Sequence, residues 1–174
     1  MIVVNHVIQF LHNPLAYEQK LVSVINSKGE QIPLSSSTEL YSDPDVTVKI
    51  EGMERFNPVI QNKCEFYKRK YGHTGPVTCH LFIAKQYSPS FGLHTDPDDV
   101  IIYCVDGTKT MTIDGVYTTL NRGEEVFIPA DTPHIAHNEH AAITLSFGLE
   151  KFLIDKAKNY ELDTLPKDHG DLQP

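Results

Sequence analysis

Short apolar runs fill the second half of the chain, and they predict a series of β-strands. From residue 76 onward the runs are VTCHLFIA, VIIYCV, KTMTI, VYTTL, EVFIPA, HIAHN and AITLSFGL, and after the longer segment 85–99 that follows the first run only a few residues separate each from the next. Strands this short, with tight turns between them, are typical of all-β proteins. The pattern therefore predicts an antiparallel sandwich or barrel.

Turn-forming residues mark three of the connections between these runs. Asp-Gly stands at 106–107 and again at 114–115, and NRGE stands at 121–124. Asp-Gly between two apolar runs is among the strongest short-range signals for a β-hairpin. We expect tight turns at all three points, the first of them joining VIIYCV to KTMTI.

The first half of the chain has a mixed pattern. Residues 15–26 carry leucine, valine and isoleucine at helical spacing before the stop SKG, so they predict a helix. Residues 57–70 begin with Asn-Pro, a typical helix start, and predict a second helix. VTVKI at 46–50 predicts a short strand, and residues 149–159 predict a closing helix.

Neither an internal repeat nor a linker divides the sequence. A length of 174 residues fits one domain. We expect a single domain over residues 1–174. Strands and helices make up residues 1–75, the barrel core occupies 76–149, and a helix and polar tail follow over 150–174.

Composition narrows the class of protein. Apolar residues make up 40% and charged residues 22%, which is ordinary for a globular protein. The sequence shows no signal peptide and no apolar run long enough to cross a membrane, so we expect a cytoplasmic protein with no membrane partner. The three cysteines are widely spaced, which favours buried thiols over disulfides or a zinc site.

The net charge of −8 argues against nucleic acid as a partner, because it gives a phosphate backbone no long-range attraction. The basic stretch KCEFYKRK is interpreted as the solvated face of a helix.

The stretch FGLHTDPDD contains the first candidate chemistry. His94 and Asp96 are two residues apart, so in an extended segment their side chains emerge on the same face. Such a pair could bind a metal if a third ligand approached it, or it could be a polar turn. His134 is the histidine with a suitable setting, in GEEVFIPADTPHIAHN.

That second stretch resembles the second motif of the cupin superfamily, G-x5-P-x-G-x2-H-x3-N. Gly123, Pro129, His134 and Asn138 match in spacing, and Asp131 stands where the family has glycine. The resemblance implies a cupin-type double-stranded β-helix, or jelly roll, which is mainly β, with flanking N-terminal helices and one C-terminal helix.

The first cupin motif is present in altered form. His94 matches, Asp96 replaces the second histidine, and Val100 takes the place of the usual glutamate ligand. The set His94, Asp96 and His134 then corresponds to the two-histidine, one-carboxylate triad of non-haem Fe(II) oxygenases.

SFGLHTDPDDVIIYCVDGTKTM is similar to the motif of a narrower group, the JmjC-type and cupin-like Fe(II)/2-oxoglutarate hydroxylases, which include ribosomal oxygenases and an asparaginyl hydroxylase. This resemblance implies a dioxygenase with Fe(II) as metal, 2-oxoglutarate as co-substrate, and His94, Asp96 and His134 as the catalytic metal ligands.

In that group a basic residue fifteen positions after the first histidine binds the distal carboxylate of 2-oxoglutarate, and here that residue is Lys109. Thr144 and Ser146 share a strand face and are assigned as further co-substrate contacts. The family's tyrosine upstream of the ligands is replaced by Phe82, which leaves His80 as a substitute contact.

Several alternatives stay open. Asp98, Asp99 and Tyr87 flank the ligand loop and are expected at the mouth of the cavity, whereas His137 is expected to face outward. A metal-dependent cupin enzyme that does not use 2-oxoglutarate and a non-enzymatic ligand-binding cupin are the alternative functions.

The substrate is expected to be a small molecule or a protein side chain, and a homodimer is an option. Ribosomal oxygenases carry further domains after the barrel, which we do not expect here, about forty residues being left after His134.

Overall fold

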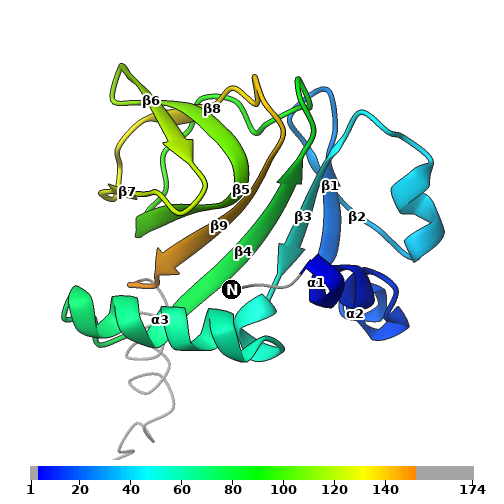
Figure 1. Ribbon diagram of the computed structural model, residues 1–174, viewed down its shortest axis with the longest axis horizontal. Coiled ribbons are helices and arrows are strands. Elements are labelled where there is room, and N and C mark those ends of the chain that lie inside the picture. Colours follow the sequence, from blue (N-terminus) through cyan, green and yellow to red (C-terminus); the bar gives the residue numbers. More distant parts are fainter. Residues whose placement is uncertain (1–3, 152–174) are drawn as a thin grey trace, which may run out of the picture.

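Nine antiparallel strands form the sheet of this computed structural model, which describes residues 4–151 (Figure 1). The main path of neighbours runs β2-β1-β3-β4-β9-β5-β6, and β7 and β8 pair with β5. The prediction of a mainly β jelly roll is thereby confirmed. The strands are β1 (Val22–Ile25), β2 (Gln31–Pro33), β3 (Thr47–Glu51), β4 (Val77–Ala84), β5 (Asp99–Ile113), β6 (Val116–Asn121), β7 (Glu125–Ile128), β8 (His134–Ala136) and β9 (Ala142–Leu149).

Helical segments cluster in the N-terminal half. They are α1 (Val4–Leu11), α2 (Pro14–Glu18), the 3-10 turns η1 (Ser37–Tyr41) and η2 (Met53–Arg55), and α3 (Pro58–Lys70). The predicted helix at 57–70 is confirmed: the Asn57 side chain caps it by accepting from the backbone N–H groups of Val59 and Ile60. None of the helices among residues 4–151 has the length and apolar character to span a membrane.

The predicted helix at 15–26 is wrong in its second half. The chain is helical only through α2, and Lys20 then takes a positive φ of 56°, which ends the helix. Val22–Ile25 instead forms β1, which is buried along its whole length and pairs with β2 and β3. A short apolar run buried on both faces has no alternation that would distinguish a strand from a helix.

The main apolar core lies between the sheet and α3, which runs beneath β4 and β9 in Figure 1. Alternation along the strands sends one set of side chains toward this helix: Ile50, Cys79, Leu81, Leu145 and Phe147. Their neighbours in sequence point to the opposite face: Lys49, His80, Phe82, Thr144 and Ser146. The face away from the helix is therefore the one that can carry polar chemistry.

β5 is a single bent strand of 15 residues, so the predicted hairpin at 106–107 is wrong. Its first part pairs with β9, the register shifts between Cys104 and Asp106, and the strand then continues beside β6. Gly107, at φ 74°, lies at this irregularity and allows the bend. The Asp-Gly turn at 114–115 is confirmed, since both residues have positive φ and the turn joins β5 to β6.

The other predictions for this half have mixed outcomes. The strand predicted at 46–50 is confirmed as β3. The turn at 121–124 joins β6 to β7, but these strands pair with β5 and not with each other. Cys64, Cys79 and Cys104 are free and buried, as expected. The predicted helix at 149–159 lies outside the described residues beyond Lys151, and Leu149 is the last residue of β9. The single-domain organisation stays a prediction.

Candidate metal centre

His94, Asp96 and His134 lie together, with one ligand atom from each within 4.8 Å of the others. A two-residue bridge brings them into place. The backbone N–H of His94 donates to the carbonyl of His134 at 3.1 Å, and the reverse bond measures 2.9 Å. This bridge ties the loop before β5 to the start of β8, so the ligands meet although forty residues separate the two histidines.

Asp131 stabilises the same junction. Its backbone N–H donates to the carbonyl of Asp96 at 2.8 Å, and its φ is 60°. Aspartate tolerates this left-handed conformation better than most residues, which explains how it replaces the glycine of the cupin motif.

Hydrogen bonds to the backbone orient both imidazole rings. Nδ1 of His94 lies 2.9 Å from the carbonyl of Gly92, and Nδ1 of His134 lies 2.9 Å from the carbonyl of Thr132. Because a carbonyl can only accept, each Nδ1 carries a proton, and Nε2 is the nitrogen that faces the other candidate ligands. This is the arrangement in which histidine binds a metal through Nε2 with its other nitrogen fixed by a second partner.

The donor set fits a divalent transition metal. In its protonated form, Nε2 of His134 donates to Oδ2 of Asp96 at 3.3 Å, and this hydrogen bond lowers the pKa of Asp96 and raises the pKa of His134. Two imidazole nitrogens and one carboxylate oxygen on one side leave further coordination positions for other ligands. Val100 is buried in an apolar cluster, so it supplies no fourth ligand, as predicted.

A cavity of about 480 Å³ opens beside the three ligands. Such a volume lies within the usual range for small-molecule sites. Its polar lining, besides the three ligands, includes Lys49, His80, Lys109, Asn138, Thr144 and Ser146. Phe82, Phe91, Ile102 and Met111 contribute apolar surface.

Lys109 points into this cavity from β5 and is only 7% exposed. Its Nζ donates to Oδ1 of Asn138 at 2.9 Å, and no carboxylate among residues 4–151 pairs with it. Burial lowers the pKa of Lys109 to about 8. An anion bound in the cavity would therefore pair with this ammonium group and favour its charged form.

Asn138 positions the lysine. Its side chain is buried, and its Nδ2 donates to the carbonyls of Ser88 and Pro89 at 3.0 and 3.3 Å. These two bonds identify the remaining amide atom as the oxygen, which faces Lys109. The sequence marked Asn138 only as part of a motif, and the structure adds this contact.

The other predicted co-substrate contacts lie on neighbouring strands of the same face. Thr144 and Ser146 on β9 line the cavity, directly opposite Phe82 and His80 on β4. Burial lowers the pKa of His80 to about 4, and the charge of Lys49 adds to this effect. His80 is thus a neutral imidazole on the cavity wall near neutral pH.

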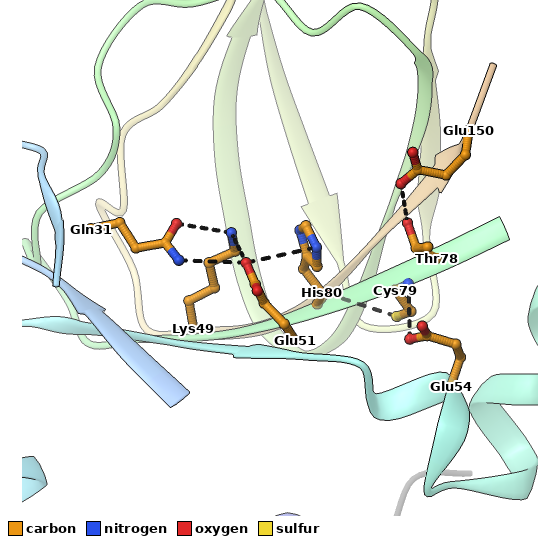
Figure 2. A network of polar contacts seen from close by, with 8 residues as sticks. All are labelled: Gln31, Lys49, Glu51, Glu54, Thr78, Cys79, His80 and Glu150. Carbon is orange, nitrogen blue, oxygen red and sulfur yellow. Dashed lines mark hydrogen bonds and ion pairs between the residues drawn. The ribbon is translucent and has the colours of Figure 1, made fainter. Parts of the chain in front are cut away.

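A second polar cluster, which includes the lining residues Lys49 and His80, was not predicted, and Figure 2 shows it. Nζ of Lys49 donates to Oε1 of Glu51 at 2.6 Å and to Oε1 of Gln31 at 3.0 Å, and His80 lies beside Glu51. The alternation of VTVKI placed Lys49 opposite Val48 and Ile50, but only the pairing of β3 with β4 shows that this face borders the cavity.

The acidic residues after Asp96 do not line the cavity. Asp98 and Asp99 accept from the backbone and side chain of Lys151, and Asp99 also accepts from the backbone of Ala130. Tyr87 is exposed outside the lining. His137 likewise lies outside the lining, as expected, and contacts Thr112 and Tyr117.

Comparisons with known proteins agree with this fold. Residues 83–148 match the cupin domain family model. No curated protein sequence matches the chain. YcfD, a ribosomal oxygenase from Escherichia coli, has a similar fold with a TM-score of 0.63 at 14% identity, over 99% of this chain and 52% of that one. This chain therefore spans about half the length of YcfD.

Two smaller structures are also similar. The SPY1581 protein of unknown function from Streptococcus pyogenes has a TM-score of 0.45 at 16% identity, over 61% of this chain and 75% of that one. KdgF from a Halomonas species has a TM-score of 0.42 at 15% identity, over 64% of this chain and 86% of that one. Residues 83–148 thus resemble a cupin domain, and His94, Asp96 and His134 form a group within this stretch that could hold a metal ion.

Proposed function

We propose that this protein is an Fe(II)- and 2-oxoglutarate-dependent dioxygenase that hydroxylates a small metabolite or a protein side chain. The single observation that carries the proposal is Lys109, a buried lysine without a carboxylate partner among residues 4–151, in the same cavity as a two-histidine, one-carboxylate set. The similarity in fold to a ribosomal oxygenase agrees with this reaction class.

Each side chain has a defined task in the proposed site. His94, Asp96 and His134 hold the metal from one side. Lys109 binds the distal carboxylate of 2-oxoglutarate, and Asn138 keeps the ammonium group in place. The hydroxyl groups of Thr144 and Ser146 donate to the co-substrate from β9.

The apolar residues of the lining exclude water from the reacting groups. When bound, Fe(II) and 2-oxoglutarate supply the oxidising chemistry, in which O2 yields succinate, CO2 and a hydroxylated C–H bond. The polypeptide contributes binding, orientation and a shielded cavity.

Anaerobic titration tests the proposal. Addition of Fe(II) and 2-oxoglutarate should give a metal-to-ligand charge-transfer absorption band. Lys109→Ala should weaken 2-oxoglutarate binding about 100-fold, or roughly 2.7 kcal/mol, because it removes a buried charge-assisted hydrogen bond. Its metal affinity should stay within about twofold of the wild type, since Lys109 is not among the three ligands.

Lys63→Ala is the matched control, because Lys63 lies on α3 outside the cavity, 3.8 Å from Glu125. The proposal would be contradicted by a folded protein that gives no absorption band. It would also be contradicted if Lys109→Ala weakened metal binding and 2-oxoglutarate binding equally. Metal binding without formation of succinate from 2-oxoglutarate would favour a cupin enzyme that does not use this co-substrate. Absence of metal binding would favour a non-enzymatic cupin.

A further inference from the structure

Two lysines line the cavity, and the proposed function uses only one of them. Lys109 comes from β5, whereas Lys49 comes from β3, and β4 and β9 lie between these strands in the sheet. Lys49 is 7% exposed. A second buried lysine in the same cavity requires an explanation of its own, because burial of a charged side chain is costly unless it is paired.

Lys49 has one donor left for a ligand. An ammonium group carries three N–H donors. Two of them reach Glu51 and Gln31, at 2.6 and 3.0 Å. No acceptor among residues 4–151 takes the third, and the side chain belongs to the cavity lining. Figure 2 shows Lys49 and His80 on the same side of their strands, away from Cys79 and Glu54.

Glu51 places a negative charge beside that donor: it is two residues from Lys49 on the same face of β3, although it is not itself part of the cavity lining. Its Oε1 accepts from Lys49 and from Gln31, while no described residue forms a hydrogen bond or ion pair with its Oε2. Its side chain is 34% exposed. Burial acts to raise the pKa of Glu51, but the hydrogen bond and charge of Lys49 outweigh it, so the net pKa is lowered. His80, 4.0 Å from Oε1, is uncharged near neutral pH and adds a polar group without a further charge.

The charges already present limit what the cluster can accept. The charges of Lys49 and Glu51 neutralise each other. A ligand with a single charge would therefore give the cluster a net charge with no counter-ion. A ligand that presents an anionic oxygen to Lys49 and an N–H donor to Glu51 keeps both members paired. An α-amino acid carries these two groups on one carbon atom.

Phe91 connects this cluster to the metal ligands. The Nζ of Lys49 lies 5.7 Å from the centre of the Phe91 ring, and the ring of His94 lies 6.0 Å from it on an edge-to-face contact. A ligand anchored at Lys49 and lying along Phe91 would extend toward His94, Asp96 and His134. The volume of about 480 Å³ suits 2-oxoglutarate together with a second small molecule.

We propose that Lys49 and Glu51 form the recognition site for the primary substrate, and that this substrate is a small zwitterion of the α-amino acid type. Lys49 takes its carboxylate, Glu51 takes its ammonium group, and its side chain extends past Phe91. The inference rests on the proposed function for the reaction that follows binding, but the binding site itself stands on contacts of its own.

Ligand-observed NMR tests the site without turnover. Each common L-amino acid is titrated into protein loaded with Mn(II) and 2-oxoglutarate under nitrogen, and also into metal-free protein. At least one should bind with a dissociation constant of about 1 mM or tighter. Its decarboxylated amine and its deaminated acid should each bind at least about tenfold more weakly.

Two variants locate the site. Lys49→Met and Glu51→Gln should each weaken the binding of that amino acid at least about tenfold. The affinity for 2-oxoglutarate should stay within about twofold of the wild type. Lys63→Met is the matched control, since it removes a lysine paired with a carboxylate outside the cavity. Circular dichroism and thermal melting check folding. Should Lys49→Met fail to fold, Glu51→Gln carries the test, because it keeps the shape of the side chain.

Three results would overturn the inference: no amino acid binds, the variants bind as tightly as the wild type, or either truncated analogue binds as well as its parent. Failure of the proposed function has a different signature. There the protein would bind neither Fe(II) nor 2-oxoglutarate, while the metal-free titration would still report on Lys49 and Glu51.

Discussion

At the scale of single residues, the site depends on how a buried lysine is charged. Lys109 has an amide oxygen as its partner and no carboxylate among the described residues, so burial lowers its pKa to about 8. The ammonium form therefore predominates only below that pH in the ligand-free protein. A carboxylate bound beside it would favour the charged form and raise the pKa again.

We predict that 2-oxoglutarate affinity falls above pH 8 because of Lys109. Above its pKa the lysine must take up a proton before it can pair with the carboxylate, so the dissociation constant should rise by up to about tenfold per pH unit. Lys109→Arg should show a flatter profile between pH 7 and pH 9.5, since arginine stays protonated throughout. Isothermal titration calorimetry at several pH values measures the dissociation constant for the wild type and for Lys109→Arg. The same pH dependence in the two proteins would contradict the assignment.

The stability of the ligand-free protein should change in the opposite direction. Because the folded-state pKa of Lys109 lies below the ordinary value of 10.5, the unfolded chain binds more protons between pH 8 and pH 10.5. This residue's contribution to the free energy of unfolding therefore increases with pH over that window, while 2-oxoglutarate affinity decreases.

The three candidate metal ligands and Lys109 could be singled out in the sequence because motif spacing identifies them. Lys49 could not, since it precedes the motif by more than forty residues and nothing in VTVKI distinguishes it from a lysine that faces solvent. Its position depends on β3 pairing with β4, which aligns Lys49 with Phe82 and Glu51 with His80. That register is a long-range property of the sheet.

At the scale of elements, two Asp-Gly pairs have different outcomes. At 114–115 the flanking runs pair with each other, as β5 and β6, and the dipeptide forms the turn. At 106–107 the run before the dipeptide pairs with β9 and the run after it with β6, so the strand bends and continues. The dipeptide alone does not show which strands its neighbours will pair with. This bend carries Lys109 into the cavity.

We predict that Gly107→Ala destabilises the protein by about 2–4 kcal/mol. A Cβ at this position would lie 2.1 Å from the carbonyl oxygen of Ala141, and φ is 74°. Gly115→Ala is the matched control: its φ is 78°, but nothing lies within 4 Å of the added atom. It should cost only ~1–2 kcal/mol, the strain of the left-handed backbone. Urea denaturation measures both, and equal losses would show that the approach to Ala141 has no role.

At the scale of the whole molecule, the N-terminal strands complete the cavity. Ile25 and Lys49, which line it, come from β1 and β3, and these strands extend the sheet beyond the residues that match the cupin domain. The similarity in fold to YcfD covers 99% of the chain and so includes this extension. The net charge of −8 does not attract an anion such as 2-oxoglutarate, so Lys109, which has no carboxylate partner among the described residues, must supply the local attraction.

The same architecture predicts how metal affects the stability of the molecule. His94 and Asp96 come from the loop before β5, and His134 comes from β8, so the three ligands meet only in the folded chain. A metal that binds the folded state at 100 times its dissociation constant stabilises it by about 2.7 kcal/mol. For a chain of this length that corresponds to a rise in Tm of about 5–10 °C. Thermal melting of chelator-treated protein, with and without Mn(II) or anaerobic Fe(II), measures it.

Variants separate this effect from general stabilisation by divalent ions. His134→Ala and Asp96→Ala should lose the metal-dependent rise in Tm, because each removes one of the three ligands. Lys109→Ala should keep it but should lose the further rise that 2-oxoglutarate adds to the metal-loaded wild type. If Asp96→Ala kept the full metal response, the ion would be bound elsewhere, and the two histidines joined by the backbone bridge would be a structural pair.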